Sequence, residues 1–474
     1  MIELQGFAPD ANPTIPGVIT DCDQLIPDTD GMKGAPSAID MGHNALPAVC
    51  RGAAIVSDLT GARRIYAGTA AGLYELSVDT WTDRSATTYS LGADDRWSFI
   101  QFANTSIAAT PTTGIQRSTG GAFSVIAGAP QAKLVEAAEG FVVAFNTSSF
   151  ADEWYCSAYL DDTDWTLDVS TQCVKGRLVG GSGEITAARR FGSDIVAYKG
   201  GSMFHGRYQG PPAVWTWQQV STDVGCIGQD AVADTAVGHI FVGRDNVYRY
   251  DGTTPVPIAT GTIRRWLFRE MDPTTSFKTQ LLWDRQNHLV WIFFPSTNTG
   301  ILDKCVVYHV LTQRWGVANR VVEQVLNYIS PQLTFAGLTR FPTFDDLPAI
   351  SFDSLYWVGG ALQPAIIGTD HKISQLAGSA GSAYFITGDY GDESGYTFCD
   401  NFRVRYTRSP SSSSVTGYVR DTAGGSLEAG TARSVSDGQH HMRQRGRFHR
   451  FRVSTTGDFT VTGIRPQLKP AGVR

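Results

Sequence analysis

The sequence lacks long apolar runs and nearly lacks stretches of helix-forming composition. Its densest apolar run, LVWIFFP at 289–295, stops at a proline, whereas a membrane-spanning helix needs about 18–20 consecutive apolar residues. Windows rich in Ala, Glu, Lys and Leu are nearly absent, while the 474 residues include 50 glycines and 11% aromatic residues. These features argue against membrane insertion by this chain and against a helical bundle, and they predict a soluble β-rich protein.

Cysteine is scarce and scattered. The seven cysteines are odd in number, form no C-x-x-C pair and have no histidines at zinc spacing around them. The N-terminus, MIELQGFAPD, has neither the basic start nor the apolar core of a secretory signal. We therefore predict buried, reduced thiols in a protein made in a cytosol, with no metal and no cofactor.

The usual catalytic and nucleotide-binding motifs are also missing. The sequence has no G-x-S-x-G, H-E-x-x-H, G-x-x-x-x-G-K-[ST] or G-x-G-x-x-G pattern. The glycine-rich LVGGSGEIT (178–186) leads into a predicted strand, which favours a tight turn over a phosphate-binding helix N-terminus. No catalytic or cofactor-binding residue is predicted, and we expect the chain not to be an enzyme.

One acidic cluster is a candidate for metal binding or catalysis. YLDDTDWTLD (159–168) contains four aspartates, which could chelate calcium or supply the carboxylate pair of a glycosidase. Counted from Asp162, however, the glycine that a helix–loop–helix calcium loop needs at its sixth position is missing. A polar turn capped by Trp165 is the favoured interpretation.

The chain begins with an extended arm, predicted over residues 1–50. Prolines at positions 9, 13, 16, 27 and 36 interrupt this segment. Proline blocks the interiors of helices and sheets, so we expect the arm to lie over a surface.

A β-propeller is predicted over residues 51–390. A unit of strand, short turn and strand recurs roughly every 35 to 65 residues, near the spacing of propeller blades with insertions. Five to seven blades fit this spacing, and only GTIRRWLFREM (261–271) resembles a helix. The recurring units lie at 64–76, 106–118, 141–160, 194–206, 240–252, 288–310 and 355–368.

Residues 391–474 are predicted to form a small antiparallel β-sandwich with a basic surface. In FRVRY (402–406), three apolar residues alternate with two arginines, as in a half-exposed strand. From position 398 onward there are 13 Lys and Arg against 5 Asp and Glu, whereas the rest of the chain carries a net charge of −14. A basic end on an acidic chain predicts contact with an acidic partner.

The segment GRFHRFRVS (446–454) carries the candidate site. As a strand it would place His449, Phe451 and Val453 toward the core, with an exposed basic ladder on the opposite face. We predict that this ladder is an assembly interface; a solvent-facing arginine row and a nucleic-acid contact are the alternatives. The predicted interface residues are Arg447, Phe448, Arg450 and Arg452.

Three parts of the sequence resemble one protein family. They are the opening APDANPTIPGVITDCDQLIPDTDGMKGAPS, the series RRWLF, WDRQNHLVWIFFP and KCVVYHVLTQRWG, and the closing RQRGRFHRFRVSTTGDFTVTGIRP. In these parts the chain resembles the tail hub or nozzle proteins of short-tailed bacteriophages, also called packaged-DNA stabilisation proteins. The resemblance extends over nearly the whole length.

The resemblance implies a non-enzymatic propeller protein of the virion tail, assembled in the cytoplasm of the bacterial host. Such a protein forms a ring of six copies below the portal and its adaptor ring. The ring continues the DNA channel, stabilises the packaged DNA without sequence-specific binding, and carries tail spikes or fibres. A glycan-binding or glycan-cleaving propeller of a receptor-binding protein is the alternative, and a scaffold propeller for host proteins is a third.

Overall fold

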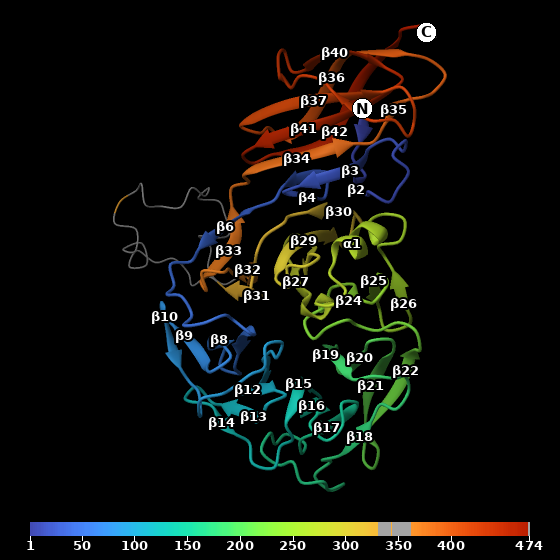
Figure 1. Cartoon of the computed structure of the whole chain (residues 1–474). Coiled ribbons are helices and arrows are strands. Elements are labelled where there is room, and N and C mark those ends of the chain that lie inside the picture. The colour runs from blue at the N-terminus through green and yellow to red at the C-terminus, as the bar shows by residue number, and fades with distance from the viewer. Residues whose placement is uncertain (330–342, 344–361, 473–474) are drawn as a thin grey trace.

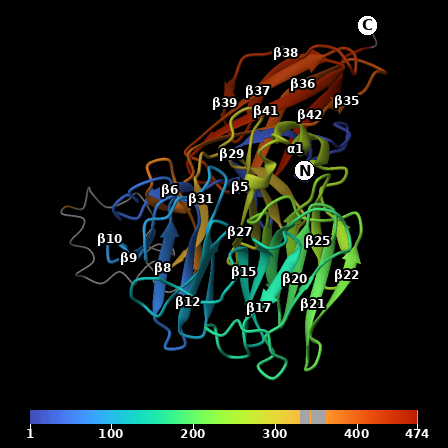
Figure 2. The same ribbon diagram turned by 60° about the horizontal axis from the view of Figure 1, so that its bottom comes forward.

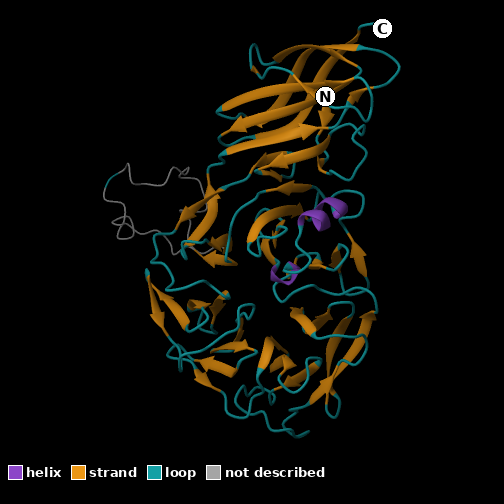
Figure 3. Ribbon diagram, viewed as in Figure 1, coloured by secondary structure: helices purple, strands orange, loops and turns teal. Residues whose placement is uncertain are grey.

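The protein consists of a β-propeller with a β-sandwich on its rim (Figure 1). The structure is a computed structural model that describes residues 1–329, 343 and 362–472. Strands make up 54% of it and helices 2% (Figure 3). The all-β prediction with a propeller is therefore confirmed.

The blades are four-stranded antiparallel sheets. Six are separate sheets in the described part of the chain, and β27–β30, the first four strands of a ten-stranded sheet, hold a seventh position. The innermost strands contact one another in the order β7, β11, β15, β19, β23, β27, β31 and back to β7, which closes the ring. The separate blades are β7 (Ala53–Ser57), β8 (Arg63–Gly68), β9 (Leu73–Ser77) and β10 (Thr80–Asp83); β11 (Ser98–Phe102), β12 (Thr105–Thr110), β13 (Thr113–Ser118) and β14 (Ser124–Val125); β15 (Ala132–Ala138), β16 (Phe141–Thr147), β17 (Glu153–Cys156) and β18 (Lys175–Arg177); β19 (Ile185–Phe191), β20 (Asp194–Lys199), β21 (Met203–Gly210) and β22 (Val214–Ser221); β23 (Val232–Thr235), β24 (Gly238–Val242), β25 (Val247–Tyr250) and β26 (Pro255–Pro257); and β31 (Gln324–Ile329), β32 (Leu362–Ile367), β33 (Ile373–Gly378) and β6 (Ser37–Asp40).

The seventh position is the most deeply buried. It contains β27 (Gln280–Asp284), β28 (Leu289–Pro295), β29 (Leu302–His309) and β30 (Trp315–Val317). Every residue of β28 is buried, because the strand has covered faces on both sides. This explains why the densest apolar run of the sequence does not alternate with polar residues. Of the predicted unit 355–368, residues 355–361 lie outside the described residues.

The N-terminal strand β6 closes the ring of blades. It pairs antiparallel with β33, so that Ile39 lies opposite Gln375. The last blade is thus completed by a strand from the other end of the propeller sequence. Opening the ring requires breaking this strand pairing.

The sandwich and the propeller share one continuous sheet. From β30 the ten-stranded sheet continues through β4 (Leu25–Pro27), β5 (Met32–Gly34), β42 (Thr460–Pro470), β36 (Thr397–Arg408) and β40 (His440–Gly446), with β1 (Ile2–Glu3) on β42. The facing eight-stranded sheet contains β2 (Gly6–Phe7), β3 (Val18–Asp23), β34 (Ser382–Thr387), β41 (Phe448–Thr456), β37 (Ser412–Arg420) and β38 (Glu428–Ala429), with β35 (Tyr390–Gly391) on β41 and β39 (Arg433–Ser434) on β37. Figure 2 shows these strands stacked above the blades.

The structure divides the chain differently from the predicted ranges 1–50, 51–390 and 391–474. The N-terminal segment is extended, but its strands pair within both sandwich sheets and the last blade. Strand β34 also joins the sandwich, before position 391. The prolines permit this because they lie between the short strands or at their ends, where no ladder hydrogen bond is lost. Pro27, for example, ends β4.

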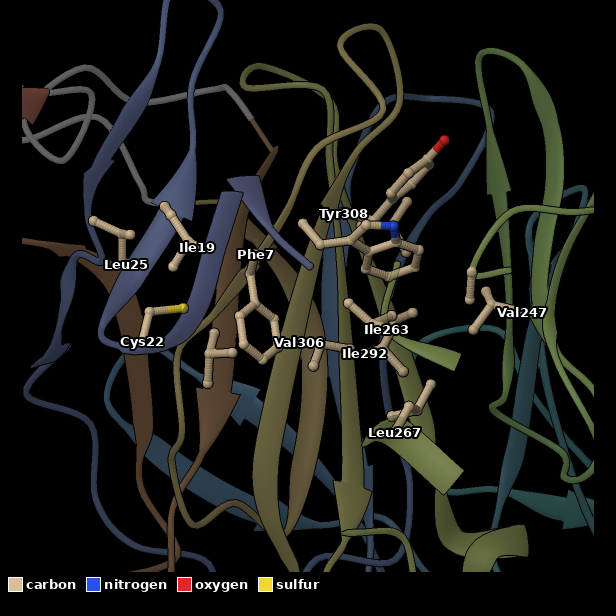
Figure 4. Close-up of a cluster of buried hydrophobic side chains, with 14 of the residues drawn as sticks. Phe7, Ile19, Cys22, Leu25, Val247, Ile263, Leu267, Ile292, Val306 and Tyr308 are labelled. Carbon is tan, nitrogen blue, oxygen red and sulfur yellow. The ribbon is translucent and has the colours of Figure 1, made fainter. Parts of the chain in front are cut away.

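A short helix between β26 and β27 packs against the N-terminal arm. The helix predicted at 261–271 is present as α1 (Arg264–Glu270), followed by the 3₁₀ turn η1 (Ser276–Lys278). Leu267 is fully buried, and the ring of Trp266 meets that of Phe7 edge-on at 5.0 Å. Figure 4 shows the resulting core, in which the arm residues Phe7 and Ile19 lie in one cluster with side chains of α1 and β28.

All seven cysteines are buried and unpaired, as the sequence predicted. Burial raises the pKa of Cys50, Cys156 and Cys226 to about 12. These thiols therefore stay protonated and act as small apolar side chains.

Candidate functional site

The predicted site strand lies in the middle of a sheet. Strand β41 pairs with β34 on one side and with β37 on the other. Its backbone hydrogen bonds are therefore used within the chain, and only its side chains can contact a partner.

The core face of β41 is as predicted. His449, Phe451 and Val453 have no exposed surface, and the Phe451 ring stacks on Phe402 at 4.4 Å. The His449 ring contacts the Thr397 hydroxyl at 2.9 Å. Burial lowers the pKa of His449, so this ring belongs to the neutral core of the sandwich.

The opposite face differs from the expected exposed ladder, because Arg450 is held by a buried carboxylate. Its guanidinium donates two hydrogen bonds to Asp389, from Nε and Nη2, each 3.0 Å long. Arg420 donates to the same carboxylate. The side chain of Asp389 is 1% exposed, and those of Arg420 and Arg450 are 13% and 17% exposed.

The two guanidiniums thus share one carboxylate, and a bidentate pair of this kind is among the stronger charged interactions. Sequence reasoning missed Asp389, because it lies 61 positions before Arg450 and follows β34 without any local pattern. Reversing the charge of Arg450 would test folding rather than assembly.

The other predicted interface residues take part in contacts between a guanidinium and an aromatic ring. Phe448 is 5% exposed, beneath the Arg420 guanidinium. Arg452 lies 4.0 Å from the centre of the Tyr384 ring, and Arg447 lies 5.1 Å from that of Tyr396. Arg447 and Arg452 remain half-buried, and an interface role for them stays a prediction.

The acidic cluster forms a turn around Trp165. The indole Nε1 of Trp165 donates to the backbone oxygen of Asp162 at 2.9 Å, and the ring is 3% exposed. Asp161 accepts hydrogen bonds from the backbone and hydroxyl of Thr163, while the Asp162 carboxylate binds Arg117 at 2.7 Å. These contacts agree with the predicted polar turn.

A second candidate site lies on the propeller axis. A cavity of about 400 Å³ is lined by residues of β7, β11, β15 and β19, which is within the usual range of about 300–1,000 Å³ for ligand pockets. Glu136 of β15 is one of its lining residues. Burial raises the pKa of the Glu136 carboxyl, and the charge of Arg189 opposes this shift.

Ionic contacts across the axis bound this cavity. Arg96, just before β11, donates to Asp230 at 2.9 Å, and Asp230 lies just before β23 on the opposite side of the ring. Arg189 of β19 donates to the second carboxylate oxygen at 3.3 Å. Arg96 also donates to Gln324, the first residue of β31. These contacts join four blades across the axis.

Sequence reasoning also missed this axial network. Arg96, Arg189 and Asp230 lie on three different blades, and no spacing within the sequence connects them. Their single shared feature is a position beside or within an innermost strand, which becomes visible only when the blade boundaries are known.

Neither a metal-binding cluster nor a membrane-spanning helix occurs among the described residues. No group of three or more His, Cys, Asp and Glu residues is placed to hold a metal ion in the described ranges. Within the same ranges, no helix is long and apolar enough to cross a membrane.

Comparison with known proteins does not identify a family for this chain. No protein-family model matches the chain, and no curated protein is similar to it. One solved structure that overlaps with it is the extracellular domain of a hybrid two-component system from B. thetaiotaomicron, with 10% sequence identity and a TM-score of 0.40. The overlap covers 80% of this chain and 44% of that chain. A similarity this low carries no argument about function.

Proposed function

We propose that this chain is a structural tail protein of a short-tailed bacteriophage. Copies of it form a ring of six below the portal and its adaptor ring. The ring continues the DNA channel, stabilises packaged DNA and carries spikes or fibres. The protein acts in the virion tail after assembly in the host cytoplasm, and it performs no catalysis of its own.

One observation carries this proposal. The three parts of the sequence that resemble the tail hub family come together in space as one structural unit. The opening part supplies β3, β4 and β5, the middle part supplies most of α1, β28 and β29 with parts of β27 and β30, and the closing part supplies β41 and most of β42. The strands β4, β5, β27–β30 and β42 belong to the ten-stranded sheet, and β3 and β41 belong to the sheet that faces it in the sandwich. Segments far apart in sequence thus form one unit, as expected if they are inherited together.

The charge distribution supports a ring. A closed ring is built from head-to-tail contacts, in which each copy presents two unlike and complementary surfaces. The basic C-terminal part and the acidic remainder of this chain provide surfaces of opposite sign.

The closed propeller axis indicates where DNA would pass. The Arg96–Asp230 contact crosses the axis, so a DNA duplex could pass through a propeller only if this contact broke. The DNA path must therefore lie between copies and not through a propeller. An acidic body suits such a channel, because each phosphate neutralised by Lys or Arg would strengthen DNA binding and hinder its movement.

The glycan alternative receives less support. A glycosidase needs two carboxyl groups free to act on the sugar. In the axial cavity, Asp230 has both oxygens engaged by guanidiniums, so Glu136 has no free partner carboxylate among the lining residues.

Light scattering after size exclusion, combined with negative-stain imaging of the purified protein over a concentration series, tests the proposal. We expect rings with a central hole at the higher concentrations. A protein that stays monomeric at every concentration and forms no ring on addition of its portal and adaptor proteins would contradict it.

A further inference from the structure

The outer face of the sandwich carries a concentrated positive charge. The side chains on this face come from β42, β36 and β40, and they alternate along each strand with residues of the sandwich core. We name this surface the basic face; it consists of Arg403, Arg405, Arg445, Arg465 and Lys469, all exposed.

The strand register places two of these arginines side by side. Arg403 of β36 lies directly opposite Arg465 of β42. Side chains in such a position are about 5 Å apart at Cβ, and like charges there destabilise the sheet. The isolated chain therefore bears a repulsion that an acidic partner would relieve.

Few carboxylates compensate this charge. Lys469 binds Asp400 at 3.4 Å, and Glu3 lies opposite Gly463 at the margin of the face. Arg403 donates to the neutral Gln439. Among the residues that the structure describes, Arg405 and Arg465 have no carboxylate partner.

The propeller presents a surface of the opposite character. The segment 157–174, which connects β17 to β18, contains four aspartates and no basic residue. Arg117 pairs with the buried Asp162, which leaves Asp161, Asp164 and Asp168 as the acidic side chains of its surface. Glu139 lies beside it, since the backbone of Leu160 donates to that of Gly140. We name the segment with Glu139 the acidic loop.

The acidic loop also exposes apolar side chains. Tyr159, Leu160, Leu167 and Val169 are 45–67% exposed. Local contacts hold the loop in place: Trp165 is buried beneath it, and the backbones of Asp168 and Cys173 pair. Because the loop is already ordered, docking costs little conformational entropy. Exposed leucines rimmed by carboxylates are typical of a protein–protein contact.

We propose that the basic face of one copy binds the acidic loop of the next copy. The two surfaces cannot meet within one chain, because β17 and β18 lie across the propeller from β36 and β42 (Figure 1). The contact is heterologous, so it generates a ring if its rotation closes. This inference rests on the proposed function and identifies the two surfaces through which the ring would form.

Cross-linking between introduced cysteines tests the contact. All native thiols are buried, so a bismaleimide will join only the introduced ones. Gln467→Cys, on the basic face, is mixed with Thr166→Cys, on the acidic loop; both positions are exposed. We expect a cross-linked pair of chains, because charge complementarity raises encounter at a specific site. When the control Ser77→Cys, at the exposed end of β9, replaces Thr166→Cys, we expect about tenfold less product. Equal yields from the two mixtures would overturn the proposal.

Charge reversal tests the chemistry of the contact. Arg403→Glu with Arg465→Glu should lower the cross-linking yield about tenfold, and Glu139→Lys with Asp168→Lys on the other chain should restore it, because the charge pairs re-form with opposite sign. Asp161→Asn with Asp168→Asn keeps the turn hydrogen bonds while removing charge, and should lower the yield without changing the melting temperature. Failure of the reversed pair to restore the yield would overturn the inference.

A DNA competitor separates this proposal from nucleic-acid binding. A short duplex added at equal concentration should leave the cross-linking yield unchanged. If the duplex binds the wild type and that binding is lost in Arg403→Glu with Arg465→Glu, the basic face is a DNA contact and the proposal is wrong. Rings that form normally without the cross-link would overturn this inference alone, whereas absence of rings would contradict the proposed function.

Discussion

The contact of Asp389 with two arginines predicts that this one carboxylate supports the folding of the sandwich. Asp389→Asn keeps the size of the side chain but removes the charge that Arg420 and Arg450 face. Breaking a buried ion pair by removing one partner costs about 3–5 kcal/mol. Because both guanidiniums keep some contact with water, we expect a loss at or below the lower limit of that range, about 2–3 kcal/mol.

Thermal unfolding followed by circular dichroism measures this effect. A loss of 1 kcal/mol shifts the midpoint by roughly 2–4 °C for a domain of 150–250 residues, so the variant should melt about 4–12 °C below the wild type. Asp392→Asn is the matched control, since Asp392 is exposed and serves a local turn with Ser394 that asparagine also forms. The control should stay within about 1–2 °C of the wild type, as surface substitutions usually do.

The partner substitution completes the test. Arg450→Met removes one guanidinium but leaves Asp389 paired with Arg420, so it should cost less than Asp389→Asn. Arg450→Glu should cost more than Arg450→Met, because it places a second carboxylate beside Asp389. If Asp389→Asn melts within a degree of the wild type, the contact does not stabilise the fold and the structural argument is refuted.

Three further predictions concern other parts of the chain. Deletion of residues 1–40 should give insoluble or unfolded protein, because it removes β6 from the last blade and β1–β5 from the sandwich; a soluble variant with the wild-type circular dichroism spectrum would show that the arm is dispensable. Burial lowers the pKa of His239 from 6.5 to about 4, so the unfolded chain binds the extra proton and stability should fall by up to about 3 kcal/mol as the pH drops from 7 to 4. His239→Gln should flatten this dependence in urea titrations at several pH values, and an unchanged slope would speak against it. A thiol reagent should label none of the seven cysteines rapidly in the native protein and all of them in guanidinium chloride; fast native labelling would show that the buried thiols open readily.

The β-propeller could be predicted because its signals are local. Each four-stranded blade contains hairpins in which a short turn joins two adjacent strands, and a unit such as 240–252 contains one hairpin within a few residues. The structure forms β24 and β25 there, followed by a turn at Gly252 with φ +102°. The helix α1 was predictable for the same reason, since its buried side chains recur at helical spacing.

The role of the N-terminal arm could not be predicted from local signals. Its prolines indicate extended chain but do not say which strand it will pair with. The pairing of Ile39 with Gln375 joins residues more than 300 positions apart, and neither segment carries a mark of the other. The sequence therefore predicted the conformation of the arm and not its place in three sheets.

The candidate site shows the same limit. Strand alternation assigned His449 and Phe451 to the core correctly, because that assignment depends only on neighbouring residues. Whether the opposite face is exposed depends on which residues cover it. Asp389, which binds Arg450, lies in the segment between β34 and β35. Alternation in FRVRY predicted that Arg403 and Arg405 share one face, but it could not predict the pairing of Arg403 with Arg465, because that pairing depends on register across two strands.

The proposed role in a phage tail is tested most directly by cryo-electron microscopy of the assembled particle that contains this chain. We expect a closed ring of copies below the portal and adaptor, each with a seven-membered propeller and a sandwich on its rim, and DNA density between the copies. No DNA density should pass through any propeller axis. Complete particles whose tail lacks this chain, or a ring with DNA threaded through the axis of a propeller, would contradict it.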